Sequence, residues 1–358
     1  MHEAGLIGKS VRVLFVFVAA ALLLACEGIQ NRLVQRVANG RAAVDPMERF
    51  DADALHVVLC GTGAPLADAD RAAACTAVVA GDSMFVVDSG PGSTENLELD
   101  DMPLGNLKGV FLTHYHSDHI GELGELNMQS WAGGGRVTPL LVYGPPGVQR
   151  VVDGFVAAYA LDSQYRVAHH GADVLPPAAA EMIAKTFDPP ADGGAVTVLK
   201  QGDLTVSAVL VDHDPIVPAV GYRFDYKGRS VVISGDTVAS DNLARLAKNA
   251  DLLVHEVLVD SVIRLASQAA AAAGRTRQAK LASDVLDYHT SPADAVEVAK
   301  QAEVDTIVFS HMVPPLPGLL VGTFFMRGVD DEGKVNVVLG EDLMRFRLPA
   351  GSDEVQQP

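Results

Sequence analysis

Short apolar runs separated by turn-forming residues dominate the first part of the chain. Four of them are bounded by Gly, Asp, Ser or Pro, namely LHVVLC, TAVVA, MFVVD and GVFLT. Runs of this length with such boundaries predict strands. Further strand-like runs (TVSAVLV, SVVISG, DLLVH, TIVFS and KVNVVLG) then alternate with helical candidates (VQRVVDGFVAAYA, DNLARLAKNA, residues 261–273 and PADAVEVAKQA). This order predicts sheets covered by helices in a layered α/β arrangement.

An apolar segment at the N-terminus predicts export. Lys9 and Arg12 precede the run VLFVFVAAALLLA, which ends at Cys26 and is shorter than the roughly 20 residues that span a bilayer. The pattern is typical of a secretory signal peptide at residues 1–25. The tetrapeptide LLAC resembles the lipobox of bacterial lipoproteins, which implies a lipid on Cys26 and anchoring to a membrane of the cell envelope (periplasm). An uncleaved anchor and a buried core segment are the alternatives.

Composition and charge narrow the class of partner. The 358 residues are 49% hydrophobic, enough for a sizeable core, and carry a net charge of -18. Such a charge argues against long-range attraction to nucleic acid or anionic lipid. Cys60 and Cys75 either form a disulfide, as an oxidising compartment allows, or remain two buried thiols.

One stretch, FLTHYHSDHIGEL, crowds titratable side chains directly after a predicted buried strand. His114, His116, Asp118 and His119 fall on the turn beyond it, where residues two apart point the same way. Imidazole and carboxylate without thiolate suit zinc first, and manganese or iron second.

Three further polar residues end predicted strands. His213 follows TVSAVLV, Asp236 follows SVVISG, and His311 follows TIVFS. Each alone could be a turn or surface residue. Strand ends form the usual rim of α/β active sites, so we expect the three to join the first cluster.

The order of these motifs resembles the metallo-β-lactamase superfamily, and most closely its ribonuclease Z-like branch. The shared motifs are HxHxDH, a His followed by GYRF, SGDT and a strand-terminal His, together with GTGAP, VVDSGPG, VYGPPG, VHE and YHTSPADA. The resemblance implies a four-layer αββα sandwich. The expected organisation is a tether at residues 26–50, a catalytic domain at 51–349 and a C-terminal tail at 350–358.

The resemblance also implies a site for two divalent metal ions. The expected ligands are His114, His116 and His213 for one metal, Asp118, His119 and His311 for the other, and Asp236 as the bridge. A water between two such cations is acidified to a pKa near 7, which yields a metal-bridging hydroxide. Asp118 is expected to orient this nucleophile, and the pair Glu256 and His289 to protonate the leaving group.

Departures from the family pattern shape the expected substrate. Members that process tRNA carry a long basic arm between GYR and SGDT, whereas only FDYKGRSVVI lies there in this chain. With the acidic charge and the expected export, this predicts a small anionic sulfate or phosphate ester and no nucleic acid. Several segments are also similar to exported arylsulfatase-type members. The alternatives are a ribonuclease Z-like tRNA 3'-processing endonuclease, a lactonase or β-lactam hydrolase, and a non-catalytic envelope binding protein.

Two insertions could cover the site. The loop QYRVAHHGADVLPP follows the first predicted helix, and an alanine-rich helix lengthens the stretch between Glu256 and His289. Basic side chains in that stretch could receive an anionic ester, although helix charges more often face solvent. These side chains are Arg264, Arg275, Arg277 and Lys280.

Overall fold

The computed structural model describes residues 30–36, 39, 44–329 and 334–358. Its contacts separate Met1–Glu48 from a compact unit, Arg49–Pro358, which contains the predicted site. The predicted signal peptide and Cys26 lie outside the described residues. Within the predicted tether, residues 30–36 are helical and exposed, and Pro46–Arg49 form the 3-10 turn η1. Among the residues that the structure describes, no helix has the length and apolar character needed to cross a membrane.

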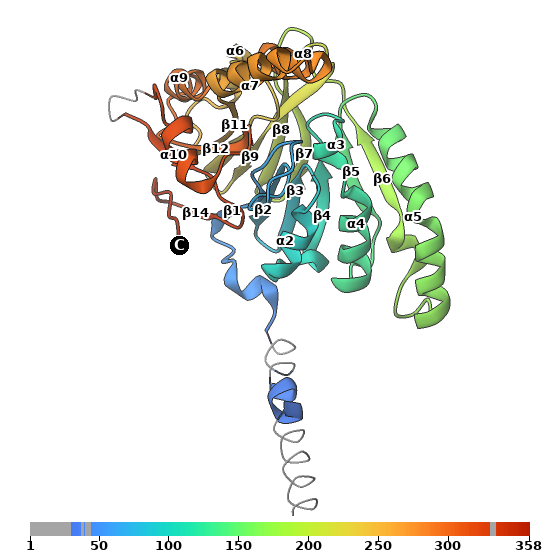
Figure 1. Ribbon diagram of the computed structural model, residues 1–358. Coiled ribbons are helices and arrows are strands. Elements are labelled where there is room, and N and C mark those ends of the chain that lie inside the picture. Colours follow the sequence, from blue (N-terminus) through green and yellow to red (C-terminus); the bar gives the residue numbers. More distant parts are fainter. Residues whose placement is uncertain (1–29, 37–38, 40–43, 330–333) are drawn as a thin grey trace, which may run out of the picture. The chain divides into compact units, whose positions relative to one another are not determined.

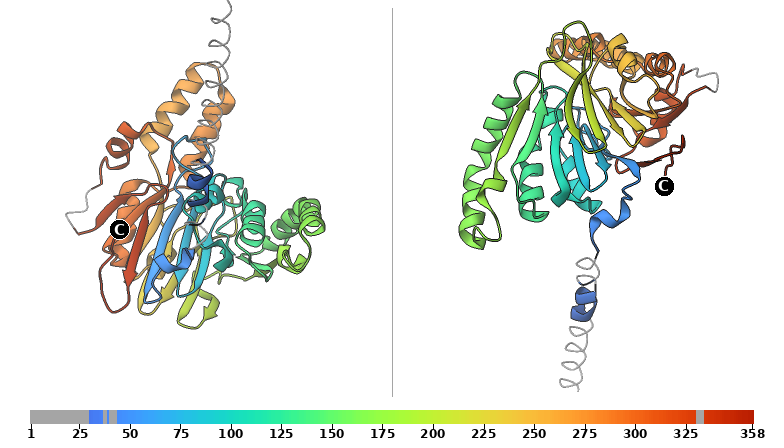
Figure 2. Two further views of the ribbon diagram at one scale, coloured as in Figure 1. Left: turned by 90° about the horizontal axis from the view of Figure 1, so that it is seen from below. Right: turned by 180° about the vertical axis from the view of Figure 1, so that it is seen from behind.

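Two seven-stranded sheets form the centre of the compact unit (Figures 1 and 2). The first sheet has the order β14-β1-β2-β3-β4-β5-β6, with β1 (Ala54–Gly61), β2 (Cys75–Ala80), β3 (Ser83–Val87), β4 (Leu107–Phe111), β5 (Leu140–Gly144), β6 (Met182–Thr186) and β14 (Arg345–Pro349). The second has the order β13-β12-β11-β10-β9-β8-β7, with β7 (Val196–Gln201), β8 (Leu204–Val211), β9 (Ala219–Tyr226), β10 (Arg229–Ile233), β11 (Leu252–Leu258), β12 (Thr306–Val313) and β13 (Asn336–Leu339).

Helices cover the outer faces of both sheets. Against the first sheet lie α2 (Ser93–Leu99), α4 (Leu123–Met128) and α5 (Val148–His170), and against the second lie α6 (Asp241–Leu246), α9 (Pro292–Ala302) and α10 (Gly318–Phe325). The remaining elements are η2 (Leu104–Asn106), α3 (Ser117–Ile120), η3 (Gln129–Gly133), η4 (Pro177–Ala180), α7 (Asp260–Ala272), α8 (Thr276–Asp284) and η5 (Val285–Asp287). The predicted αββα sandwich is therefore confirmed.

The core between the two sheets explains why these runs form strands. Phe111 of the first sheet stacks on Tyr143 at 4.6 Å between ring centroids and meets Phe224 of the second sheet edge-on at 5.2 Å. All three are buried in one cluster with the apolar residues of both inner faces. Strands buried on both faces read as continuous apolar runs, as LHVVLC and SVVISG do.

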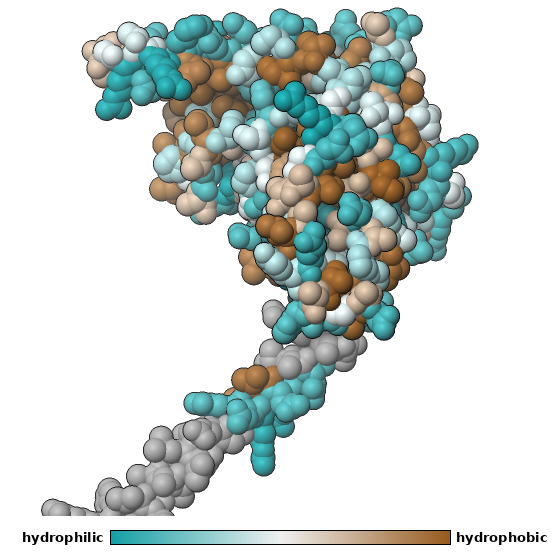
Figure 3. Space-filling model, turned by 90° about the vertical axis from the view of Figure 1, so that its right-hand side faces the viewer, coloured by the Kyte–Doolittle hydropathy of each residue, from teal (hydrophilic) through white to brown (hydrophobic). Residues whose placement is uncertain are grey.

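The helix α5 is longer than predicted. The segment QYRVAHH, expected to be a loop, continues the helix as far as His170. No Gly or Pro interrupts the chain between Gly154 and Gly171, and Arg166 pairs with Asp162 one turn earlier at 2.7 Å, which favours helix. Figure 3 shows this side of the molecule, where hydrophobic side chains are scattered among hydrophilic ones.

The two cysteines and the C-terminal segment are both held to the sandwich by contacts that the sequence left open. Cys60 and Cys75 form a disulfide between β1 and β2, with 5.0 Å between their Cα atoms. The C-terminal segment 350–358 contacts the sandwich, since Val355 packs against the core between the sheets and Arg229 donates a hydrogen bond to the carbonyl of Glu354 at 3.0 Å.

Candidate metal centre

The segment after β4 brings four predicted ligands to one place. The chain leaves the strand at Phe111, turns through His114 and His116, and enters the short helix α3, which contains Asp118 and His119. Three of the four side chains are buried and His116 is half-buried. Their convergence follows from the turn, because a straight strand would have pointed alternate residues to opposite faces.

Two further predicted ligands arrive from the second sheet. His213 follows β8 by two residues, and Asp236 follows β10 after a tight turn at Gly235. Gly235 has a φ of 61°, and a Cβ there would lie 2.8 Å from the carbonyl oxygen of Val220. Only glycine allows the chain to turn so close to β9 and aim Asp236 at the first sheet.

His311 reaches the site through a bulge rather than a strand end. It was predicted to lie just beyond a strand, but β12 continues to Val313. Opposite it, β11 pairs Glu256 with Ser310 and Val257 with Met312, which leaves His311 as the extra residue, with a φ of 44°. A bulge redirects one side chain without ending the strand, and such bulges are common beside active sites.

Asp236 lies between two groups of imidazoles. Its Oδ2 atom is 3.8 Å from Nε2 of His114 and 3.9 Å from Nε2 of His213. The same oxygen is 3.3 Å from Nε2 of His119 and 3.5 Å from Nε2 of His311. One carboxylate therefore faces both groups.

The potential ligand atoms of each group are close enough to hold a cation. Nε2 of His114 lies 3.0 Å from Nδ1 of His116, and Oδ2 of Asp118 lies 3.1 Å from Nε2 of His311. All potential ligand atoms within the group His114, His116, His213 and Asp236, and within the group Asp118, His119 and His311, lie within 4.8 Å of one another. Tetrahedral ligands at zinc distances are separated by about 3.3 Å, so modest side-chain movements complete each shell.

Buried atoms without partners fit the same interpretation. Among the described residues, Nε2 of His119, Nε2 of His213 and Oδ1 of Asp236 are buried and have no hydrogen-bond partner. Leaving such a group unpaired costs about 1–3 kcal/mol each, and buried polar groups are normally satisfied. The two imidazole nitrogens lie 3.3 and 3.9 Å from Oδ2 of Asp236, inside the cluster, so the donor set fits two divalent cations.

Asp88 supports the centre and was missed by the sequence analysis. Its carboxylate contacts Nδ1 of His119 at 2.8 Å and accepts hydrogen bonds from the backbone and hydroxyl of Thr113, each at 2.8 Å. A carboxylate on the far nitrogen of a ligating histidine fixes its tautomer and orientation. The available signal was its place in MFVVDSGPG, at a predicted strand end like that of Asp236.

The surroundings of most of these histidines favour the neutral form of the ring. Burial lowers the pKa of His114, of His116 and of His213, which favours the uncharged ring that binds metal. His119 differs, because the carboxylates of Asp236 and Asp88 outweigh its burial and raise its pKa well above the usual range. A cation bound beside His119 must therefore displace a proton.

The two predicted carboxylate ligands are held ionised. Burial alone would raise the pKa of Asp118, but hydrogen bonds from His119 and His311 outweigh it and hold the pKa far below the usual range. Burial also acts to raise the pKa of Asp236, but the charges of His311 and His119 outweigh it and lower this pKa. Both side chains are anionic at neutral pH, as metal ligands must be.

Glu256, which is buried, and His289, which is half-buried, form a pair beside the ligands. Nδ1 of His289 lies 3.1 Å from Oε1 of Glu256, an oxygen that also accepts the backbone N–H of Thr290 at 2.9 Å. The carboxylate outweighs burial and raises the pKa of His289 to about 9. The ring stacks on His311 with centroids 5.6 Å apart, and one of its nitrogens lies within 4.8 Å of potential ligand atoms of Asp236 and His311. His289 could also contact a cation together with Asp236 and His311.

The hollow beside the centre has an acidic wall. It measures about 610 Å³, is bounded by residues 64–73 and reaches Ser117 and Asp118. Besides Asp118, its carboxylates are Asp68, Asp70, Glu95 and Asp342. The guanidinium of Arg71 is bound to the hydroxyl of Thr62 at 2.5 Å and the carbonyl of Gly340 at 2.6 Å. The hollow therefore offers little attraction to a polyanion.

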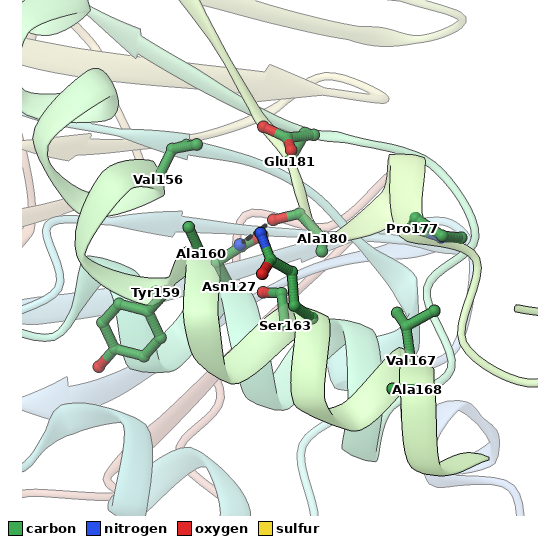
Figure 4. Close-up of a pocket in the computed structure, with 11 residues that line it drawn as sticks. Asn127, Val156, Tyr159, Ala160, Ser163, Val167, Ala168, Pro177, Ala180 and Glu181 are labelled. Carbon is green, nitrogen blue, oxygen red and sulfur yellow. Dashed lines mark hydrogen bonds between the residues drawn. The ribbon is translucent and has the colours of Figure 1, made fainter. Parts of the chain in front are cut away.

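A second cavity, under α5, lacks the chemistry of a reaction site. It measures about 340 Å³ and lies between α5, α4 and η4, as Figure 4 shows. Glu181 is its one titratable carboxylate, and the amide of Asn127 is bonded to the carbonyl of Ala180 at 2.7 Å. None of the predicted ligands lines it.

The fold and the centre define the class of protein. The chain belongs to the metallo-beta-lactamase superfamily, whose model matches residues 69–311. The prediction of a metal-dependent hydrolase acting on ester bonds is thereby confirmed, and the clusters indicate a dinuclear site for divalent cations. Within the superfamily, the chain falls in the ribonuclease Z-like branch, as its motifs predicted.

Curated relatives support that branch. The chain is 36% identical over 297 residues to "Ribonuclease Z" of Mycobacterium bovis (strain BCG / Pasteur 1173P2), covering 82% of this chain and 98% of that protein. It is 34% identical over 306 residues to "Ribonuclease Z" of Mycobacterium marinum (strain ATCC BAA-535 / M), covering 83% and 99%.

Solved structures share the fold. The short form of human tRNase Z superposes with a TM-score of 0.59 at 20% identity, covering 82% of this chain and 99% of the other. The metallo-beta-lactamase fold protein YhfI from Bacillus subtilis gives 0.58 at 19% identity, covering 82% and 100%.

These relatives correct the predicted substrate. A small sulfate or phosphate ester with no nucleic acid partner was expected, and this prediction is wrong because the relatives are ribonucleases Z. The arylsulfatase-type similarity is not supported by them. The error lies in the use of net charge. Charges farther than about 8 Å from a phosphate are screened at physiological salt, so the -18 of the whole chain says little about a local contact.

Proposed function

We propose that this chain is a ribonuclease Z-type endonuclease, which hydrolyses a phosphodiester bond of precursor tRNA on its 3' side. The observation that carries the proposal is the position of Asp236 between two groups of imidazoles, with His289 held by Glu256 beside them. The ribonucleases Z that align over almost their whole length support the choice of RNA.

The proposed ligands follow the two groups. His114, His116 and His213 would hold one zinc ion, Asp118, His119 and His311 the other, and Asp236 both. Manganese and iron suit the same nitrogen and oxygen donors. When bound, such a pair of cations acidifies a water molecule and neutralises charge that develops on the phosphoryl oxygens.

The chain's own residues would handle the protons. Hydrolysis forms one P–O bond to water oxygen and breaks one bridging P–O bond, and the departing oxygen needs a proton. The carboxylate of Glu256 raises the pKa of His289, so the ring would carry and donate this proton, while Glu256 keeps it oriented. Asp118 is a weak base because its pKa is so low, so we assign it to orienting the water.

The direct test is cleavage of a precursor tRNA with a 3' extension. The full-length chain, loaded with zinc or manganese, should release the extension at a single position, and a chelator should stop the reaction. Loss of both cation sites with unchanged cleavage would contradict the proposal. So would retention of two cations without cleavage of the precursor.

We further propose that the protein is exported and anchored through a lipid on Cys26. The disulfide between Cys60 and Cys75 supports this, because such bonds persist mainly in oxidising compartments. The substrate RNA would then be met outside the cytoplasm. Replacing Cys26 with Ser should move the protein, with its nuclease activity, from the membrane fraction to the soluble fraction. Continued membrane attachment would contradict lipidation.

A further inference from the structure

The helices α7 and α8 form a hairpin that leads into the metal centre. The hairpin begins two residues after β11, the strand that contains Glu256, and continues through η5 to Tyr288 and His289. The carbonyl of Tyr288 lies 2.9 Å from Nδ1 of His213. The base of the hairpin therefore forms part of the wall of the centre, and its tip projects from the sandwich (Figure 2).

The base of the hairpin is fixed by packing. Ile263 is buried in a cluster with Leu258 and Val313, against which Ala282 and Leu286 of the returning segment also pack. The two helices are joined by a hydrogen bond from the hydroxyl of Ser267 to the carbonyl of Ala279 at 2.8 Å. The tip is thus held in a defined position relative to the ligands.

The charges at the tip are unpaired and positive. Arg275 and Arg277 are exposed, and neither side chain has a hydrogen-bond or ion-pair partner among the residues that the structure describes. The other two basic residues of the hairpin are paired. Nε of Arg264 lies 3.4 Å from Asp260, and Nζ of Lys280 lies 2.8 Å from Asp284. Two free guanidinium groups therefore remain at the tip.

We propose that Arg275 and Arg277 form a phosphate-binding tip that grips the backbone of the RNA substrate away from the cleaved bond. This inference rests on the proposed ribonuclease function. The planar fork of an arginine suits bidentate contact with phosphate. The hollow beside Asp118 has an acidic wall, so the tip attracts the phosphates of a long substrate where the hollow does not.

The distance from the tip to the centre predicts which substrates respond. Arg277 precedes His289 by twelve residues, in a segment that is α-helical to Asp284 and 3-10 helical to Asp287. At roughly 1.5 and 2.0 Å per residue, a straight segment of this kind spans about 20 Å. An arginine side chain is much shorter than this separation, so we expect the tip to assist binding of long RNA and not the chemistry.

The test replaces both arginines with alanine in the full-length, metal-loaded protein. Precursor tRNA should bind more weakly, with KM raised about tenfold at low salt and kcat within twofold of the unmodified protein. The slope of log Kd for mature tRNA against log salt should fall by about 1.4–1.8, as expected for two lost phosphate contacts. Hydrolysis of bis(p-nitrophenyl) phosphate, which is too small to reach the tip, should not change.

A matched control removes two equivalent charges elsewhere. Lys108 and Lys200 are exposed, lack partners among the described residues, and lie near the ends of β4 and β7 remote from the metal centre. The variant Lys108→Ala/Lys200→Ala should keep the KM and salt slope of the unmodified protein. An equal effect of the two double variants would overturn the proposed tip, because it would indicate a response to total charge.

The outcomes separate this inference from the proposed function. If the unmodified protein hydrolyses bis(p-nitrophenyl) phosphate but neither cleaves precursor tRNA nor binds mature tRNA, both proposals fail. If it cleaves precursor tRNA and the arginine variant has unchanged KM and salt slope, only the tip is wrong. Loss of binding to vesicles containing phosphatidylglycerol, with unchanged RNA binding, would assign the arginines to a membrane and also overturn the tip.

Discussion

The metal centre and the α7–α8 hairpin are built in opposite ways. Potential ligands come from segments as distant as His114 and His311, and all but His116 and His289 are buried. The hairpin is one continuous segment, Asp260–Asp284, with an exposed tip. The centre therefore depends on the whole sandwich, while the exposed tip of the hairpin can change with little effect on the fold.

This contrast separates chemistry from recognition. A ligand such as Asp236 acts on every substrate, since it faces both groups of imidazoles. A residue at the hairpin tip acts only on substrates long enough to reach it. Substitutions in the two regions should therefore change different kinetic constants, and the predictions below test this division.

The largest effect is expected from Asp236→Ala. Removing the oxygen that faces both groups should reduce occupancy at both cation positions and lower the rate on every substrate by roughly a thousandfold or more. Elemental mass spectrometry, which measures the number of metal ions bound per chain, checks the expected loss of occupancy. Asp225→Ala, which alters a half-buried carboxylate of β9 that is paired with Arg223, is the control and should retain both cations. Unchanged stoichiometry in the Asp236 variant would refute its bridging position.

His289→Ala should slow hydrolysis while leaving the cations bound. A lost proton donor costs about 10²–10⁴-fold, and the loss should be greatest for substrates with poor leaving groups. A series of aryl phosphodiesters with different leaving groups measures this dependence. An equal loss across the series would exclude proton donation by His289.

The pH dependence of activity should also report the proton of His289. The pKa of His289 is raised to about 9, so its proton is present at neutral pH and is lost as the pH rises through that value. Activity should therefore fall at alkaline pH. Bound cations will move this alkaline limb of the pH profile to lower pH, because they repel the charged ring of His289. Glu256→Gln removes the carboxylate that stabilises the charge and should move the limb lower still. A limb that stays in place would contradict the role of Glu256.

Asp88→Asn should weaken metal binding without abolishing it. The carboxylate holds Nδ1 of His119, and loss of such a partner typically costs about 10–100-fold in metal affinity or activity. Asn tolerates the backbone φ of 59° at this position, which limits damage to the fold. Competition with a chromogenic chelator measures the metal affinity. An unchanged affinity would mean that Asp88 only stabilises the local backbone, through its hydrogen bonds with Thr113.

The smallest effect is expected from Arg264→Ala on the same hairpin as the tip. Arg264 is exposed and already paired with Asp260, and such surface pairs contribute about 0–1 kcal/mol. KM for precursor tRNA should stay within twofold of the unmodified value. A loss as large as that of the Arg275/Arg277 variant would show that binding follows the charge of the whole hairpin.

The ligand cluster could be predicted because its signal is local. His114, His116, Asp118 and His119 stand within six positions, and His213 and Asp236 follow clear apolar runs. The bulge that presents His311 could not be predicted, since it depends on how β12 pairs with β11. The role of Asp88 required knowing that His119 lies beside it in space.

The substrate was harder to predict than the fold. A whole-chain charge averages over distances at which salt screens it, so it says little about a local contact. The sequence showed the basic side chains between Glu256 and His289, but not that Arg275 and Arg277 are unpaired while Arg264 and Lys280 are paired. The length of α5 was underestimated because its second half lacks a clear apolar face. The buried residues of this helix, Val148 and Val152, both lie in its first half. The disulfide remained an open alternative until β1 and β2 were placed side by side.

The most direct test of the account is anomalous X-ray scattering from crystals of the zinc-loaded protein. The predicted result is two peaks about 3.5–4 Å apart, with Asp236 between them. One peak should contact His114, His116 and His213, and the other Asp118, His119 and His311. A single peak, or two peaks that do not share Asp236, would contradict the paired centre on which the proposed chemistry depends.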